Sequence, residues 1–97
     1  MTSSPVPHIH PGEILREEFL LPLKLSPGAL ARKLLVPRTR IERIVTERSP
    51  ITIDTALRLA KYFKTTPQFW MNMQTSYDLQ CAKDELESEL AAIEAAA

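Results

Sequence analysis

A short segment that carries two helix starts and one tight turn does most to limit the folds open to this chain. Ser26-Pro27 is typical of a helix start, because serine caps free N–H groups and proline suits the first helical turn. Leu35-Val36 follows shortly after, and Pro37 then opens a second helical segment. Two short helices joined so closely are typical of a helix-turn-helix. The apolar side chains expected to face inward from this pair are Leu30, Ala31, Leu34, Ile41, Ile44 and Val45.

The outer face of the second expected helix is basic. With about 100° of turn per residue, Thr39 and Arg43 point away from the apolar side, and Arg38 and Arg40 flank them. Arginine pairs with two atoms of guanine, and the methyl group of threonine can contact that of thymine. We therefore expect Arg38, Thr39 and Arg43 to meet base edges in the major groove of DNA. Arg40 and Arg48 are expected to contact phosphates.

The start of each short helix adds to this expected DNA surface. Free N–H groups at a helix start attract anions, so Ser26 and the residues after it can hold a phosphate. Pro37 belongs to the same set because it opens the second helix. A basic helix taken alone more often only keeps a surface soluble. Here a capped first helix, a short turn and an apolar seam occur together, and this combination favours DNA binding.

Charge is separated along the chain although its sum is zero. Residues 24 to 48 hold seven basic and two acidic side chains, whereas residues 78 to 97 hold six acidic side chains and one basic. The first segment can attract phosphates, and the second would repel DNA. We therefore expect the acidic segment to lie away from the DNA surface.

The remaining patterns predict an all-α fold of five helices. A first helix begins near Pro11-Gly12, and Pro22 is expected to stop it. Thr52 and Thr66-Pro67 are start signals for a fourth and a fifth helix. The apolar faces expected for these three helices are Ile14, Leu15 and Phe19 in the first, Ala56, Leu57, Leu59, Ala60 and Phe63 in the fourth, and Phe69, Trp70, Met73 and Tyr77 in the fifth.

A length of 97 residues predicts one domain. We assign residues 1–10 to a flexible N-terminal arm and residues 11–80 to the helix-turn-helix DNA-binding domain. Residues 81–97 are rich in Ala, Glu and Leu, which have high helix propensity, and are expected to form a C-terminal helical extension that either frays or serves as the arm of a dimer.

Leu35 departs from the usual composition of a helix-turn-helix turn. Glycine is common at this position, because the backbone there often takes a positive φ. Leucine in that conformation would cost about 1–2 kcal/mol. Either the turn differs locally or the fold tolerates the strain.

Several other functions find little support in the sequence. Cys81 is the single cysteine, so an intrachain disulfide is excluded and a reducing cytoplasm is the expected location. The sequence has no apolar run of the roughly 20 residues that a membrane span needs, and we expect no membrane contact. His8 and His10 lack further ligands for a closed metal site, and His10 is expected to help cap the first helix instead. Because no nucleophile stands with a base, we expect no catalytic residue, no cofactor and no enzymatic activity.

Five blocks of this chain occur together in a known family of small proteins: residues 10–19, 30–32, 36–44, 50–60 and 67–74. Together they closely resemble the HigA-type antitoxins, which are XRE-like helix-turn-helix proteins also called the virulence-associated protein I group. The similarity extends from about residue 8 to residue 79. The combination of blocks is specific, whereas the helix-turn-helix block alone would mark only the wider superfamily.

The resemblance implies a fold and a function. The fold would be a five-helix lambda-repressor-like domain with an extended C-terminal helix. The protein would be an antitoxin that binds and neutralises a HigB-like mRNA-cleaving toxin. As a homodimer it would also repress its own promoter at a palindromic operator in double-stranded DNA. The positions that carry the DNA contacts in this family are here Arg38, Thr39, Arg40 and Arg43.

The resemblance also indicates where two copies would meet. Dimer contacts in such proteins tend to involve the C-terminal helix, which points to residues 69–97. The side chains expected at the interface, or otherwise in the core, are Phe69, Trp70, Met73 and Tyr77.

Two other interpretations stay open at this point. A stand-alone transcriptional regulator would use the same DNA surface without a toxin partner. A protein-interaction module would instead pair the arginines with an acidic protein. A sharp loss of DNA binding on adding salt, with a slope that falls when Arg40 is removed, would count against this alternative. A reading frame for a small basic protein directly beside this one would favour the antitoxin.

Overall fold

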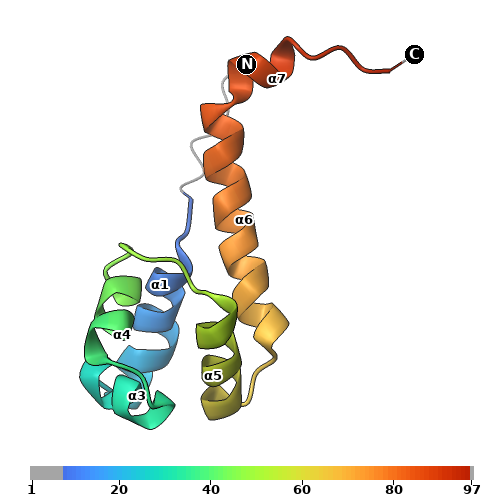
Figure 1. The fold of residues 1–97 in the computed structure, drawn as a ribbon. Coiled ribbons are helices and arrows are strands. Elements are labelled where there is room, and N and C mark those ends of the chain that lie inside the picture. Colours follow the sequence, from blue (N-terminus) through green and yellow to red (C-terminus); the bar gives the residue numbers. More distant parts are fainter. Residues whose placement is uncertain (1–7, 97) are drawn as a thin grey trace.

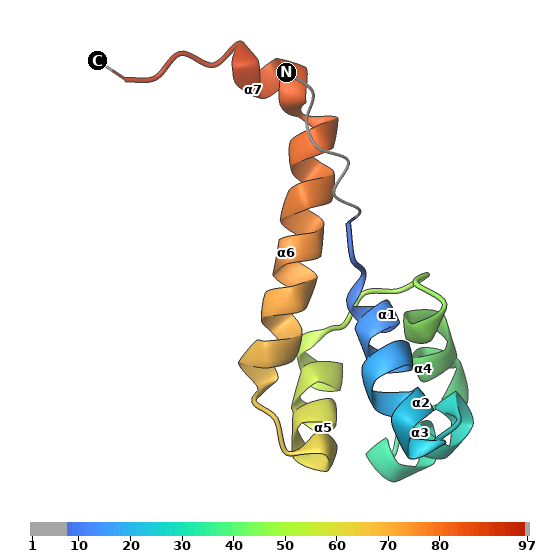
Figure 2. The same ribbon diagram turned by 180° about the vertical axis from the view of Figure 1, so that it is seen from behind.

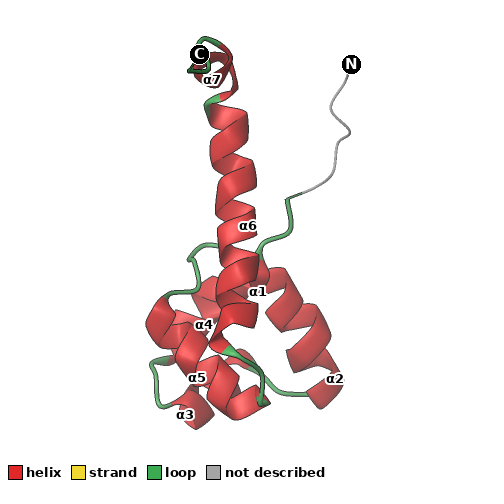
Figure 3. Cartoon of the chain, turned by 90° about the vertical axis from the view of Figure 1, so that its right-hand side faces the viewer, coloured by secondary structure: helices red, strands yellow, loops and turns green. Residues whose placement is uncertain are grey.

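The computed structural model describes residues 8–96, which form a helical body from which one long helix projects (Figure 1). No strand occurs among these residues. The projecting helix makes the molecule elongated, with principal extents of 52 × 26 × 21 Å (Figure 3). The elements in chain order are α1 (Pro11–Ile14), η1 (Leu15–Leu20), α2 (Leu21–Leu23), α3 (Pro27–Leu34), α4 (Arg38–Val45), α5 (Ile53–Phe63), α6 (Pro67–Glu85) and α7 (Glu87–Ala91). The all-α fold with a helix-turn-helix is confirmed.

The first three elements form one continuous helical stretch. Nδ1 of His10 accepts a hydrogen bond from the backbone N–H of Gly12 at 2.8 Å, which confirms the expected cap. The expectation that Pro22 stops this helix was wrong, because the stretch continues to Leu23. A proline ring clashes with the carbonyl four residues earlier in a regular α-helix. The wider π-helical pattern of η1, in which the N–H of Leu21 bonds to the carbonyl of Arg16, precedes Pro22 and gives the ring room.

The other expected helix starts are capped as the sequence indicates. Oγ of Ser26 accepts from the backbone N–H of Ala29 at 3.1 Å at the start of α3. Thr52 and Thr66 cap α5 and α6 in the same way, each accepting from the N–H three residues later. Such caps contribute about 1 kcal/mol each, and they fix where the helices begin.

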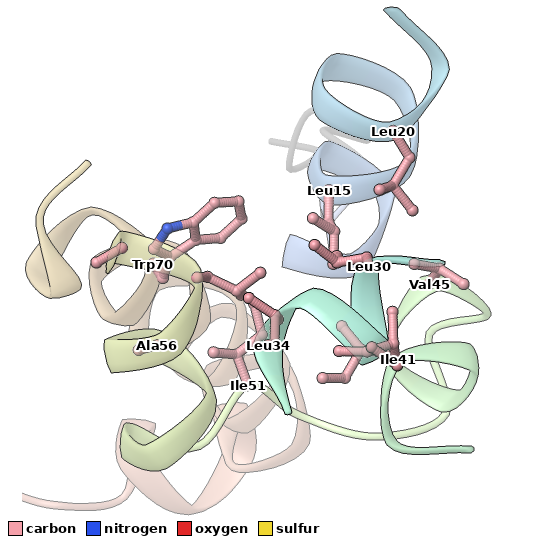
Figure 4. Close-up of a cluster of buried hydrophobic side chains, with 13 residues drawn as sticks. Leu15, Leu20, Leu30, Leu34, Ile41, Val45, Ile51, Ala56 and Trp70 are labelled. Carbon is pink, nitrogen blue, oxygen red and sulfur yellow. The ribbon is translucent and has the colours of Figure 1, made fainter. Parts of the chain in front are cut away.

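The core of the body gathers apolar side chains from η1, α3, α4 and α5, from Ile51 in the loop before α5, and from the first turn of α6 (Figure 4). The inward faces expected for the helix-turn-helix pair are all buried in it. Complete burial of one such side chain stabilises the fold by about 1.5–3 kcal/mol. The fully or almost fully buried members are Leu15, Leu20, Leu30, Ala31, Leu34, Ile41, Ile44, Val45, Ile51, Ala56, Leu59, Ala60 and Trp70.

Trp70 lies at the centre of an aromatic cluster inside the chain. It is 0% exposed, and its ring centroid is 4.9 Å from that of Phe19. Its indole Nε1 donates a hydrogen bond to Oγ1 of Thr65 at 2.8 Å. A side chain without exposed surface has nothing to offer a second copy, so the expectation that Trp70 lies at the dimer interface was wrong. The alternative, that it belongs to the core, is confirmed.

Leu57 is a second correction to the expected core. It was placed on the apolar face of α5, but the structure leaves it 54% exposed. The buried face of α5 is instead completed by Thr55, a polar residue with 2% exposure. The expected apolar face of α5 wrongly included Leu57, because this residue lies about 160° away from the buried Leu59 around the helix axis.

The two ends of the chain differ from the expected arm and extension. Residues 1–7 of the expected flexible arm lie outside the described residues, and His10, its last residue, is buried. In the C-terminal extension the helix breaks at Leu86, resumes as α7 and ends at Ala91. The expected extension is therefore helical only as far as Ala91, residues 92–96 have no regular structure, and Ala97 lies outside the described residues. Side chains beyond Cys81 are exposed, so packing adds little there to helix propensity.

Candidate nucleic-acid interface

The position of α4 is set by a close approach of the first helix. A Cβ atom added to Gly12 would lie 1.7 Å from the carbonyl oxygen of Ile44, so only glycine fits between these two backbones. Nη1 of Arg16 donates a hydrogen bond to the carbonyl of Val45 at 2.5 Å, at the end of α4. The same atom lies 3.4 Å from the carboxylate of Glu47. The C-terminal half of α4 is thereby fixed to the body.

The turn between α3 and α4 has the strained backbone considered for Leu35. This residue takes φ 61° and ψ 44°, the left-handed conformation, and its side chain is 84% exposed. The fold therefore tolerates the strain. Nη1 of Arg58 on α5 donates to the carbonyls of Leu34, at 2.8 Å, and of Leu35, at 3.4 Å. These bonds satisfy carbonyls at the end of α3 that have no partner within the helix.

Asp54 connects this turn to the outer face of α4. Its carboxylate accepts from Nε of Arg58 at 2.8 Å and from Nη1 of Arg40 at 2.7 Å. The hydrogen bond from Arg58, and after it the bond from Arg40, hold the pKa of Asp54 below its usual value. Arg40 is therefore turned toward α5, and a phosphate contact from Arg40 would have to compete with this carboxylate.

The structure brings three of the expected DNA-contact residues around one shallow groove. Thr39 and Arg43 lie on its α4 side, and Arg48 reaches it from the loop that follows. Pro27, in the first turn of α3, forms its other side. All three expected contact residues are exposed. The groove thus joins the outer face of α4 to the start of α3, where Ser26 forms the cap.

Arg38 stands beside this groove, next to the first turn of α3. Its Nε lies 3.2 Å from a carboxylate oxygen of Glu42, one turn later on α4. A Cβ atom on Gly28 would lie 3.0 Å from Cδ of Arg38, so the arginine stem passes close to the α3 backbone. Its side chain is 71% exposed and its ion pair is open to solvent. Such a pair is weak, and Arg38 can exchange Glu42 for a nucleic-acid acceptor at little cost.

Residues that position this surface were missed by the sequence analysis. Gly12 and Arg16 fix the C-terminal end of α4, and Arg58 supports the turn between α3 and α4. The spacing of Asp54 and Arg58 is a recognisable i,i+4 pair. The contacts of Arg58 with α3 and of Arg16 with α4 join residues far apart in the sequence, and no local signal shows them.

Between residues 8 and 96 no group of three or more His, Cys, Asp or Glu side chains is placed to hold a metal ion. Within that range no helix has both the length and the apolar character required to cross a membrane.

Comparison with known proteins agrees with this geometry. A family described as helix-turn-helix matches residues 15–70. Virulence-associated protein I of Dichelobacter nodosus is 55% identical over 83 residues, which cover 86% of this chain and 77% of the relative. A solved structure of the Pseudomonas aeruginosa antitoxin HigA with the higBA promoter is 46% identical, covers 91% of this chain and 97% of its own, and superposes with a TM-score of 0.88. A HigA-family addiction module antidote protein from Coxiella burnetii is 41% identical, covers 95% and 100% of the two chains, and also has a TM-score of 0.88.

Proposed function

Because this chain belongs to the helix-turn-helix family, in the group of the HigA antitoxins and virulence-associated protein I, we propose that it is the antitoxin of a toxin–antitoxin pair. In this role it binds double-stranded operator DNA, represses its own promoter and neutralises a toxin by direct contact. The observation that carries the DNA half is the groove that unites Thr39, Arg43 and Arg48 with the start of α3. Both activities take place in the cytoplasm, and neither requires enzymatic chemistry or a cofactor.

We propose separate roles for the exposed polar and basic side chains around the groove. Thr39 and Arg43 enter the major groove and read base edges, since they lie on the outer face of α4. Arg38 joins them when it releases Glu42. Arg48 and the capped start of α3 at Ser26 hold phosphates on either side, which fixes the register without reading sequence.

We propose a second role for Arg40 beside the expected phosphate contact. Its bond to Asp54 connects α4 to α5 and helps to hold the outer face of α4 in place. A phosphate contact from Arg40 requires this carboxylate to be shared. Pro37 makes no DNA contact of its own in this proposal, because it acts by starting α4.

A palindromic operator requires two copies of the chain, each with α4 in a major groove and with half-sites about 10 base pairs apart or a multiple of that. Along α6, Phe69 is 39% exposed and Met73 is half-buried, so both have exposed surface that a second copy could bury. Tyr77 is already in edge-to-face contact with His10 of its own chain, at 4.8 Å between ring centroids. We propose Phe69 and Met73, with the outer edge of Tyr77, as the start of the dimer contact.

The proposed partner is a HigB-like toxin that cleaves mRNA. This follows from the family, whose solved members include the HigA antitoxin with the promoter of the higBA pair. The test is co-expression with the small reading frame adjacent to this gene. Rescue of growth and a stable complex through a tag on this chain are the expected results. Absence of both, with operator binding intact, would leave a stand-alone repressor and overturn the antitoxin role.

Arg43→Ala tests the DNA surface. We expect this variant to bind a promoter fragment about 1–3 kcal/mol more weakly and to lose discrimination at one base position, as measured by fluorescence anisotropy at fixed salt. Lys83→Ala is the matched control, because it removes one positive charge from α6, outside the proposed DNA contact. Equal operator affinity of Arg43→Ala and the unmodified chain would remove Arg43 from the interface.

A further inference from the structure

The groove between α4 and the start of α3 contains an acidic side chain that the DNA contact proposed above does not use. Glu42 lines this groove with Thr39 and Arg43, and it is the only acidic residue among the described residues that line it. Its side chain is 45% exposed. A carboxylate at this place is repelled by phosphates, so it weakens the contact with DNA of any sequence. An acidic residue here is therefore informative about which DNA the groove accepts.

Glu42 lies on the outer side of α4 between Arg38 and Thr39. With about 100° of turn per residue, it is about 40° from Arg38 and about 60° from Thr39 around the helix axis, whereas the buried Ile44 is about 160° away. Oγ1 of Thr46 donates a hydrogen bond to the backbone carbonyl of Glu42 at 2.8 Å. The side chain of Glu42 thus extends from a fixed turn of α4 into the same groove as the residues proposed to read bases.

The ion pair with Arg38 is not a sufficient reason for an acidic residue at this position. Nε of Arg38 lies 3.2 Å from a carboxylate oxygen of Glu42, but the two side chains are 71% and 45% exposed, and exposed pairs are weak. The order along the helix, with the cation first, is also the less favourable one. When Arg38 turns to a guanine, the carboxylate loses this partner. The DNA must then supply a hydrogen-bond donor in its place, or the carboxylate opposes binding.

The major groove of DNA offers such a donor on only two bases. These are the N4 amino group of cytosine and the N6 amino group of adenine, and adenine places the acceptor N7 beside its amino group. Guanine and thymine present acceptor atoms there, which repel a carboxylate. Cytosine is therefore the base that Glu42 fits best. The guanine paired with it presents O6 and N7, which an arginine fits, so Arg38 and Glu42 together match the two bases of one C·G pair.

We propose that Glu42 is a specificity-determining residue, which accepts a hydrogen bond from N4 of one cytosine in each half-site while Arg38 contacts the guanine of the same pair. The inference rests on the proposed DNA-binding function and names a base pair that the operator contains. At sites without this cytosine the carboxylate meets only acceptors and phosphates. Glu42 therefore lowers affinity for all DNA and lowers it most for the wrong sequences, which raises discrimination.

The test measures the affinity of the unmodified chain for its promoter fragment and for unrelated DNA of the same length, by fluorescence anisotropy at fixed salt. Equal affinity for the two would overturn the proposed DNA function and this inference together. With a preference for the promoter established, each cytosine of one half-site is replaced in turn by 2-pyrimidinone, which lacks the N4 amino group and leaves the paired guanine in place. We expect one position at which this replacement weakens binding by about 10-fold.

Glu42→Ala identifies the side chain that reads this amino group. At the sensitive position we expect the variant to respond to the loss of N4 by less than about twofold, and we expect its affinity for unrelated DNA to rise about threefold because one negative charge is gone. Glu94→Ala is the matched control. It removes the same charge from residues 92–96, which follow α7 at the far end of α6 from α3 and α4 (Figure 2), and it should behave as the unmodified chain.

A second base analogue separates reading by Glu42 from positioning of Arg38. Replacement of the paired guanine by 7-deazaguanine removes N7, and it should weaken Glu42→Ala as much as the unmodified chain, because Arg38 is still present. If Glu42→Ala lost its response to both analogues, Glu42 would only position Arg38 and the inference would be overturned. The same response to loss of N4 in Glu42→Ala and the unmodified chain, at every cytosine, would overturn it while leaving the proposed DNA function intact.

Discussion

The body of this protein buries many of its side chains, whereas the far half of α6 leaves most of its side chains exposed. In the body, helix starts are capped, inward faces are buried, and side chains such as Arg16 and Arg58 close the ends of neighbouring helices. Beyond Cys81 every described side chain is exposed, although the helix continues. The difference teaches that the proposed DNA surface is preformed by the fold, whereas beyond Cys81 the described part of α6 buries no side chain and is joined to the start of the described chain by the contact of Nε2 of His8 with the carboxylate of Asp84 at 2.6 Å.

Gly12→Ala should damage the body most. The added methyl group would lie 1.7 Å from the carbonyl oxygen of Ile44, so α1 must move away from α4. We expect a loss of about 3 kcal/mol in the free energy of unfolding, measured by urea denaturation. Gly28→Ala is the matched control, because its methyl group would meet only the flexible stem of Arg38 at 3.0 Å. Equal stability of the two variants would show that the close approach of α1 and α4 does not hold the body together.

Arg58→Met should have the next largest effect. It removes the donor to the carbonyls of Leu34 and Leu35 and leaves Asp54 with Arg40 alone. The free energy of unfolding should fall by about 1–2 kcal/mol, because a carbonyl at the end of α3 loses its partner. Lys61→Met, an exposed residue of the same helix, provides the control for chemical denaturation. A loss no greater than in Lys61→Met would remove Arg58 from the support of the turn.

Leu35→Gly should raise stability. Glycine adopts the conformation at φ 61° without the cost that leucine incurs, and the exposed leucine side chain gives up little buried surface. The expected gain is about 1 kcal/mol, reduced by the greater freedom of glycine in the unfolded chain. Leu35→Ala separates the two causes, since alanine keeps the strain and loses the side chain. Thermal denaturation of both variants provides the measurement, and a gain in Leu35→Ala alone would assign the effect to the side chain.

Acidification should weaken the body only slightly, through His10. Burial lowers the pKa of this side chain, and the charges of Glu47 and Asp78 with a backbone hydrogen bond at Ser49 oppose that shift only in part. The unfolded chain therefore binds a proton more readily than the folded one, so stability falls as the pH drops below about 6.5 and levels off below the folded pKa. Protonation of Nδ1 also removes the acceptor for the N–H of Gly12. His10→Asn keeps a capping oxygen and does not titrate, so chemical denaturation of this variant between pH 7.5 and 5 should lose less stability.

The local sequence was enough to find most of the fold. Ser26, Thr52 and Thr66 were recognised as caps because the signal of a cap lies within a few residues of the helix it starts. The buried seam of α4 followed from its spacing, since periodicity records which side of a helix meets the core. The outward placement of Thr39 and Arg43 followed from the same spacing.

The errors have a common cause. Pro22 and Trp70 were interpreted from residue type, but their roles depend on contacts and hydrogen-bond patterns elsewhere in the fold. Leu57 was counted with the core because it is apolar, although its position on α5 faces solvent. Residue type constrains what a side chain can do, and only its neighbours decide which of those roles it takes.

The sequence by itself determined the helices, their starts, the apolar seam of the helix-turn-helix and the separation of basic from acidic charge, because these depend on residues close together in the chain. The tertiary structure alone decided that Arg58 supports the strained turn at Leu35, that Gly12 sets the place of α4, and that Trp70 is core. It also decided that Leu79, Leu86 and Leu90 stay uncovered. Each of these depends on which distant surfaces meet, and packing, which a local pattern does not encode, selects them.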